Sequence, residues 1–186
     1  MRRFICLVMA INFLLIFMPG MSYCYAADSK VELDWDYLTP YDSDRDLDTV
    51  SLHIFKKIFE TKDRSVYRGL TVTRPYGSIN LEQQTQDSSA VGVGPTYMVR
   101  YEKHNSGKLS TALEVSGGLI IYDKTFPAGG KPYNFMWRVG PRFIYKISES
   151  SSVNIGYMLM HVSNGLRTHN PSYNAKGLSL GFVTNF

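Results

Sequence analysis

The chain has 186 residues, of which 44% are hydrophobic and 13% aromatic, and its formal net charge is +4. Without residues 1–26, which contain Arg2 and Arg3 and no acidic residue, the net charge is +2, and this near-neutral balance gives no support for nucleic-acid binding. Both cysteines, Cys6 and Cys24, lie in that first segment, which excludes a disulfide or a thiol nucleophile from the remainder of the chain.

Residues 1–26 predict a secretory signal peptide. The segment begins with two arginines, continues as a long apolar run and ends with a small-x-Ala sequence at 24–26, the three features of such a peptide. A permanent membrane helix over 4–21 is the alternative, because that stretch approaches the length of a membrane span. The Pro-Gly pair that follows Met18 argues against this alternative. We therefore expect cleavage after residue 26 and a single domain over 27–186.

The remainder of the chain alternates apolar and polar residues with a period of two, which is typical of β-strands. In 135–147, for example, Trp137, Val139 and Phe143 alternate with Arg138 and Arg142. No stretch is apolar over a length that suits a membrane helix. The alternation predicts eight strands, at 31–37, 50–59, 64–73, 91–102, 109–122, 135–147, 153–163 and 177–186.

Eight alternating strands fit either a soluble barrel or sandwich with an apolar core, or a membrane barrel that is apolar outside and polar inside. Strands of about 10–13 residues suit tilted membrane strands better than globular ones. The 13 tyrosines suit the aromatic girdles of a membrane barrel, and the terminal Phe186 resembles the last residue of bacterial outer-membrane barrels. We therefore predict an all-β fold, an eight-stranded antiparallel transmembrane outer-membrane β-barrel. A soluble exported barrel that binds a small apolar ligand stays open.

The predicted connections alternate between short and long. Short ones fall near 60–63, 103–107 and 148–151, and long ones near 38–48, 74–90, 123–134 and 164–176. In outer-membrane barrels the short turns are periplasmic and the long loops external, so we expect both chain ends in the periplasm. We also expect charged inward residues to fill the lumen with salt bridges, because eight strands leave room only for side chains.

His161 and Ser163 are the candidate chemical residues. They lie two residues apart on a predicted strand and share the parity of Val153, Ile155 and Leu159, so both face the apolar, lipid-facing side. Ten residues of tilted strand before His161 climb about 25 Å, which puts the pair near the external interface. A Ser hydroxyl beside an imidazole is the minimum for an activated nucleophile.

A third group usually orients the histidine, and Asn174 has the parity to face the same patch from the last strand. The alternative is an ordinary polar rim with no catalytic role. His53, His104 and His169 have no convincing partners in the sequence. The sequence contains no metal-ligand spacing, phosphate loop or nucleotide motif, so we expect no metal and no cofactor.

Six motifs that occur in order carry a resemblance to a known family. They are Phe-Pro-Ala-Gly-Gly (126–130), Tyr-Asn-Phe (133–135), Val-Gly-Pro (139–141), Gly-Tyr (156–157), His-Val-Ser-Asn-Gly (161–165) and Asn-Pro-Ser-Tyr-Asn (170–174). Together they resemble the lipid A 3-O-deacylase (PagL-like, acyloxyacyl hydrolase) family, specifically over 126–186 and more loosely over 31–125. The resemblance implies a barrel of the bacterial outer membrane that removes the ester-linked 3-hydroxyacyl chain at position 3 of lipid A, in lipopolysaccharide, without a cofactor.

The resemblance also implies roles for individual residues. Ser163 matches the family nucleophile and His161 its general base, while Asn170 matches a residue associated with the oxyanion hole, to which the backbone of Gly165 is a further candidate donor. Asn174 stands where members carry a catalytic glutamate. An asparagine can hold a histidine tautomer, but it cannot stabilise imidazolium charge as a carboxylate does.

Two further expectations concern partners and alternatives. Lys131, Arg167 and Lys176 are candidate contacts for the phosphates of lipid A, although ordinary solvated loop charge is the better explanation for any single one of them. A non-catalytic structural barrel that inherited the fold is the second candidate function, and the neutral Asn174 makes it plausible.

Overall fold

The computed structural model describes residues 30–41, 45–81, 84–165 and 170–185, so the predicted signal peptide at 1–26 lies outside the described residues. The described elements are strands: β1 (Lys30–Pro40), β2 (Arg45–Glu60), β3 (Arg64–Leu81), β4 (Gln84–Asp87), β5 (Gly92–Ser106), β6 (Leu109–Phe126), β7 (Lys131–Lys146), β8 (Ser151–Ser163) and β9 (Tyr173–Asn185). Within the described ranges there is no helix of the length and apolarity that crossing a membrane requires.

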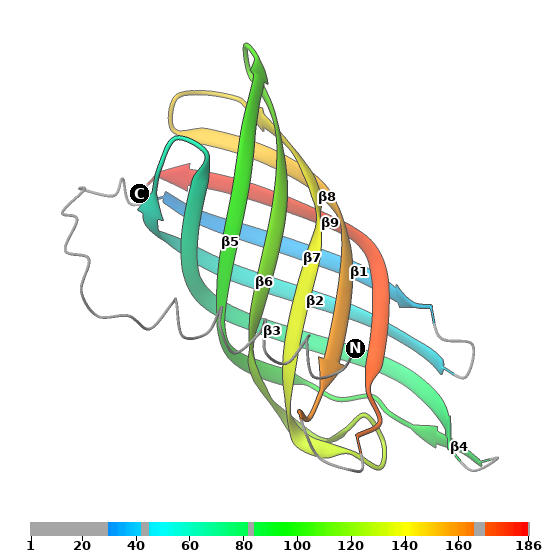
Figure 1. The fold of residues 1–186 in the computed structure, drawn as a ribbon. Helices are drawn as coiled ribbons and strands as arrows, with labels where there is room; N and C mark the ends of the chain where they lie inside the picture. The colour runs from blue at the N-terminus through cyan, green and yellow to red at the C-terminus, as the bar shows by residue number, and fades with distance from the viewer. Residues whose placement is uncertain (1–29, 42–44, 82–83, 166–169, 186) are drawn as a thin grey trace.

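Eight of these strands close into an antiparallel barrel (Figure 1). The first and last strands pair from Lys30↔Asn185 to Pro40↔Ala175, and the β2–β3 pairing completes the circle. The short strand β4 pairs with the last residues of β3 and adds a hairpin rather than a barrel strand. The prediction of an eight-stranded antiparallel barrel is therefore confirmed.

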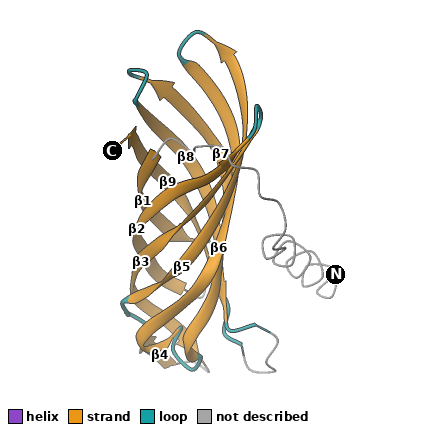
Figure 2. Cartoon of the chain, turned by 90° about the vertical axis from the view of Figure 1, so that its left-hand side faces the viewer, coloured by secondary structure: helices purple, strands orange, loops and turns teal. Residues whose placement is uncertain are grey.

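The barrel has two distinct ends, which Figure 2 shows from the side. We call the end that holds the start of β1, the end of β9 and the turns at 61–63, 107–108 and 147–150 the terminal end. We call the opposite end, with the connections at 41–44, 88–91, 127–130 and 164–172 and the β3–β4 hairpin, the loop end.

The predicted long loops over 74–90 and 123–134 are wrong. β3 continues to Leu81 with its ladder to β2 intact as far as Ile79, and the β6–β7 connection spans only 127–130. Outward residues such as Arg74 and Asp123 end the apolar alternation there, but backbone hydrogen bonds between adjacent strands continue without it. Side-chain alternation therefore indicates the extent of the apolar belt and underestimates the length of the strands.

Burial along the strands follows the pattern of a membrane barrel. Outward residues such as Leu33, Ile155 and Leu180 keep 44–46% of their surface exposed, whereas the inward carboxylates Glu32 and Asp34 are fully buried. A soluble barrel has the reverse arrangement, with charges outside and apolar residues in the core. The distribution therefore matches an outer-membrane type of barrel.

Charged side chains fill the middle of the lumen, as predicted. Arg100 lies 2.6 Å from Glu32 and 2.8 Å from Glu114, and all three are buried. Arg142 pairs with Asp34 at 3.2 Å, and Arg138 pairs with Asp36. Buried charges of this kind are stable when each is paired and hydrogen-bonded.

An apolar plug lies in the lumen at the loop end. Its members include Leu38, Leu47, Ile120, Phe126, Met136, Met158, Met160, Val162, Tyr173 and Ala175, each of which is at most 2% exposed. Four of them, Met160, Val162, Tyr173 and Ala175, alternate with outward residues at the ends of β8 and β9. The plug therefore fixes the backbone on which the candidate residues stand.

Candidate active site

His161 and Ser163 lie at the loop end of β8, on the outward face of the barrel. Their inward neighbours Met160 and Val162 are buried, Leu159 below them is exposed, and the pair itself is partly exposed. Strand alternation therefore presents both polar side chains toward the lipid side, at the rim of an apolar surface.

Asn174 lies directly opposite His161 in the β8–β9 ladder. The two side chains are joined by a hydrogen bond of 2.7 Å between His161 Nδ1 and Asn174 Oδ1. An amide oxygen only accepts, so Nδ1 is the donor in this bond, and in the neutral imidazole the lone pair then lies on Nε2. The contact with the neutral asparagine thus favours the tautomer in which Nε2 is free to accept a proton.

Trp137 flanks the histidine from the other side. It is paired with His161 in the β7–β8 ladder, and the two ring centroids are 5.6 Å apart with planes inclined by 32°. His161 is consequently held between an amide and an indole. From the sequence, Trp137 is predicted only to be one of several outward residues on its strand. Its position beside His161 is identified by the strand register.

Ser163 shares the face of His161 but is not hydrogen-bonded to it among the described residues. Residues two apart on a strand have Cα atoms about 6.5–7 Å apart, so a serine rotamer change is enough to bring the hydroxyl toward the imidazole. Looser contacts of this kind are common in unliganded active sites.

Asn170 closes the loop that follows Ser163. Its Oδ1 accepts from the backbone N–H of Asn164 at 3.0 Å, and its Nδ2 donates to the carbonyl of Gly165 at 3.0 Å. Gly165 has φ +89°, a left-handed conformation that favours glycine. The second amide hydrogen of Asn170 and the N–H of Gly165 have no acceptor among the described residues.

Of the candidate phosphate contacts that the structure describes, Lys176 lies on the same strand as Asn174. It lies on the outward face two residues beyond Asn174, is paired in the ladder with Leu159 and has its Nζ 5.8 Å from the centre of the Tyr41 ring. Lys131 is exposed at the start of β7, and Arg167 lies outside the described residues.

The expectation that His53 has no partner is wrong. Its Nε2 lies 3.1 Å from Asp36 and its Nδ1 2.7 Å from the hydroxyl of Thr71, so it belongs to the buried network of the lumen. These partners come from β1 and β3, and local sequence carries no sign of them. His169 lies outside the described residues. Within the described ranges no three His, Cys, Asp or Glu side chains converge as metal ligands do.

The fold and this site together define a membrane β-barrel with a polar Ser, His and Asn group on its outward rim. Comparison with known families makes the assignment specific. The chain belongs to the lipid A 3-O-deacylase (PagL) family, whose profile matches residues 49–183. That match covers the candidate residues from Trp137 to Asn174 and supports a lipid A deacylase function.

Two solved structures share the fold. The crystal structure of Neisserial surface protein A is 14% identical, with a TM-score of 0.59 over 84% of this chain and 96% of that chain. The crystal structure of the outer membrane enzyme PagL is 15% identical, with a TM-score of 0.54 over 85% of this chain and 100% of that chain. At these identities the likeness concerns the fold alone. No curated protein sequence matches the chain.

Proposed function

We propose that this protein is a serine esterase of the outer membrane that hydrolyses the ester-linked 3-hydroxyacyl chain at position 3 of lipid A. Ser163 is the nucleophile, His161 the general base, and Asn174 the residue that orients the histidine. The 2.7 Å bond from His161 Nδ1 to Asn174 Oδ1 supports these roles because, in the neutral imidazole, it assigns the proton to Nδ1 and the lone pair to Nε2. No cofactor is required for acyl transfer by a serine and a histidine.

In the first step, His161 Nε2 takes the proton of the Ser163 hydroxyl as the oxygen attacks the ester carbonyl. The tetrahedral intermediate then collapses, the C–O bond to the sugar breaks, and the imidazolium returns the proton to the sugar hydroxyl. Water repeats the sequence on the acyl-enzyme and releases the 3-hydroxy acid.

Two features can offset the lack of an acid at position 174. The indole of Trp137 lies against the imidazole, and a tryptophan face attracts a cation by about 0.5–2 kcal/mol. The N–H of Gly165 and the second amide hydrogen of Asn170 are the donors we assign to the oxyanion. Such donors stabilise the intermediate when they lie within hydrogen-bond distance of the developing charge.

The surroundings of the site fit a membrane lipid as substrate. Phe135, Leu159 and Leu178 lie on the outward face around it and are 42–52% exposed. Acyl chains can pack along this face while the sugar ester reaches the rim, so the lipid need not leave the bilayer. We place the loop end, and with it the site, in the outer leaflet, where lipid A resides.

The observation that carries the proposal is the His161–Asn174 hydrogen bond on the same outward face as Ser163. The test is mass spectrometry of lipid A from cells that express the wild type or Ser163→Ala. We expect wild-type cells to yield lipid A that is lighter by one hydroxyacyl group, and the variant to leave it intact. Ser151→Ala, an outward serine at the other end of β8, is the matched control and retains activity. Identical spectra from wild type and Ser163→Ala contradict the proposal.

A non-catalytic structural barrel is the second candidate, and the neutral Asn174 favours it. It predicts intact lipid A in every strain, with the barrel folded and present in the outer membrane.

A further inference from the structure

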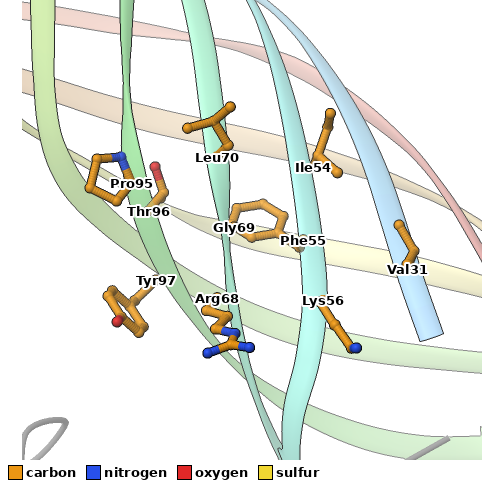
Figure 3. Close-up of a pocket in the computed structure, with 10 residues that line it drawn as sticks. All are labelled: Val31, Ile54, Phe55, Lys56, Arg68, Gly69, Leu70, Pro95, Thr96 and Tyr97. Atoms are coloured by element: carbon orange, nitrogen blue, oxygen red, sulfur yellow. The ribbon is translucent and has the colours of Figure 1, made fainter. Parts of the chain in front are cut away.

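A shallow groove of about 410 Å³ lies on the outward face of β2, β3 and β5, far from the site described above (Figure 3). Its floor includes the backbone of Gly69. An added Cβ at Gly69 would lie 2.6 Å from the ring of Phe55, which packs against the glycine from the lumen. The close packing of β2 and β3 on the lumen side therefore requires a glycine here, and the backbone of Gly69 forms part of the groove floor.

Strand register sorts the groove residues into two rows. Lys56, Arg68 and Tyr97 are paired across β2, β3 and β5, and Ile54, Leu70 and Pro95 form the next outward row. Val31, next to the start of β1, is paired with Lys56, so the first row lies toward the terminal end and the apolar row lies toward the middle of the barrel. The groove thus has a cationic edge toward the terminal end and an apolar edge toward the centre.

The two cations lie side by side without a carboxylate. Lys56 and Arg68 are direct cross-strand partners, both exposed, and neither forms an ion pair with any described residue. The adjacent Lys57 shows the contrast, because it turns inward and pairs with Glu60 at 2.5 Å. Like charges placed opposite each other on a sheet repel, so an anion that lies between them would stabilise this pair.

The groove is separated from Ser163 around the barrel and along it. β3 lies four strands from β8 in either direction, so the two sites are on opposite sides. Lys56 and Arg68 are each four residues from the ends of the strands at the 61–63 turn, a rise of about 10 Å. With the loop end outward, this level faces the leaflet opposite to that of the deacylase site.

We propose that the groove binds an anionic glycerophospholipid of the periplasmic leaflet. Lys56 and Arg68 hold its phosphate, in charge-assisted hydrogen bonds, and one acyl chain runs over Gly69 between Ile54, Leu70 and Pro95. Tyr97 provides the amphipathic ring that suits the headgroup level. This inference goes beyond the deacylase function and involves none of its residues.

The test uses the full-length barrel, purified in detergent and mixed with phosphatidylglycerol or phosphatidylcholine, with lipid retention measured by native mass spectrometry. We expect the wild type to retain phosphatidylglycerol selectively. In Lys56→Gln/Arg68→Gln we expect the affinity for this lipid to fall about 30-fold, since each interfacial cation contributes about fivefold. Arg74→Gln is the matched control, because Arg74 is an outward cation on the same strand outside the groove. Far-UV circular dichroism verifies that each variant is folded.

Three results overturn the proposal. The first is equal retention of the two lipids by the wild type, and the second is equal loss in Arg74→Gln and in the double variant. The third is displacement of the lipid by inorganic phosphate, which identifies a site for free anions. Because the readout is lipid binding, it is independent of whether Ser163 hydrolyses lipid A.

Discussion

His161 and Asn174 face each other across the β8–β9 ladder, with 2.7 Å between Nδ1 and Oδ1. The bond spans two strands whose inward residues, Val162 and Tyr173, are packed in the apolar plug. The orientation of the imidazole is therefore set by the barrel itself rather than by the loop that follows Ser163. A neutral amide supplies this orientation without the charge that a carboxylate adds.

Replacing Asn174 separates orientation from charge. Asn174→Leu removes the acceptor for Nδ1–H, and we expect deacylation to fall about 100-fold because the base is no longer held in position. Asn174→Asp keeps the geometry and adds charge, and we expect a rise of about tenfold since a charged hydrogen bond stabilises the imidazolium more. The deacylation rates of both variants are measured by mass spectrometry of lipid A over time. A loss of activity in Asn174→Asp would show that the neutral amide suits this site better.

We predict a positioning role for Trp137, which can be separated from simple packing. We expect Trp137→Leu to lower kcat about tenfold and leave KM nearly unchanged, because the indole acts on the imidazolium that forms during reaction. Trp137→Phe should retain part of the effect. Phe143→Leu, an outward aromatic lower on the same strand, is the control. A change confined to KM would assign the indole to substrate binding instead.

The sequence predicts which face each residue occupies, because strand alternation depends on parity alone. Parity places His161, Ser163 and Asn174 on the outward side, and inward Arg138 and Glu114 in the lumen. Parity does not define which residues are paired across neighbouring strands, because that pairing depends on the register that the connections impose. The alignment of Trp137, His161 and Asn174 in one row is consequently visible only in the fold.

Contacts between side chains across the lumen cannot be predicted from local sequence patterns for the same reason. His53 meets Asp36 from β1 and Thr71 from β3, and Arg100 meets Glu32 at a separation of 68 residues. Strand ends are also invisible where the apolar belt stops, as in β3 and β6, because backbone pairing continues with polar side chains. Sequence thus describes the membrane belt better than the parts of the barrel beyond it.

Gly165→Ala tests the loop that we assign to the oxyanion. At φ +89° an alanine is strained by about 1 kcal/mol, and a Cβ would lie 3.4 Å from the ring of Phe135. We expect kcat to fall about tenfold or more, because the N–H of this residue turns away from the substrate. The control is Gly107→Ala, at φ +58° in a turn of the terminal end with open space around it. It should lower the stability by a similar amount and leave the activity unchanged. Equal activity in both variants would exclude the backbone of Gly165 from the oxyanion hole.

The β3–β4 hairpin should open in acid. Asp87 accepts hydrogen bonds from the Ser89 hydroxyl at 2.7 Å, the Ser89 N–H at 3.0 Å and Lys124 at 3.0 Å, and these lower its pKa. Because the folded pKa lies below the unfolded value, the stabilisation is complete above about pH 5 and disappears as the pH falls through the folded pKa. Hydrogen exchange over 84–91 should therefore accelerate in acid, after correction for intrinsic rates. In Asp87→Asn the exchange should lose most of this pH dependence, and an unchanged acid response would point to another group.

Arg138 tests the charged layer of the lumen. Its guanidinium contacts Asp36, lies 3.1 Å from Ser116 and 3.4 Å from Glu114, and is fully buried. Arg138→Met leaves buried carboxylates without this partner, so we expect the free energy of unfolding in lipid vesicles to fall by about 3–5 kcal/mol.

Adding Asp36→Asn removes one of those charges, and the double variant should regain part of the loss, as measured by urea titration with tryptophan fluorescence. Lys146→Met breaks the exposed pair with Glu149 at the terminal end and should change the stability by about 0.5 kcal/mol or less. If Arg138→Met were as mild as Lys146→Met, water would have to reach the carboxylates, and the lumen would not be the dry, paired layer that the burial of Asp36 and Glu114 describes.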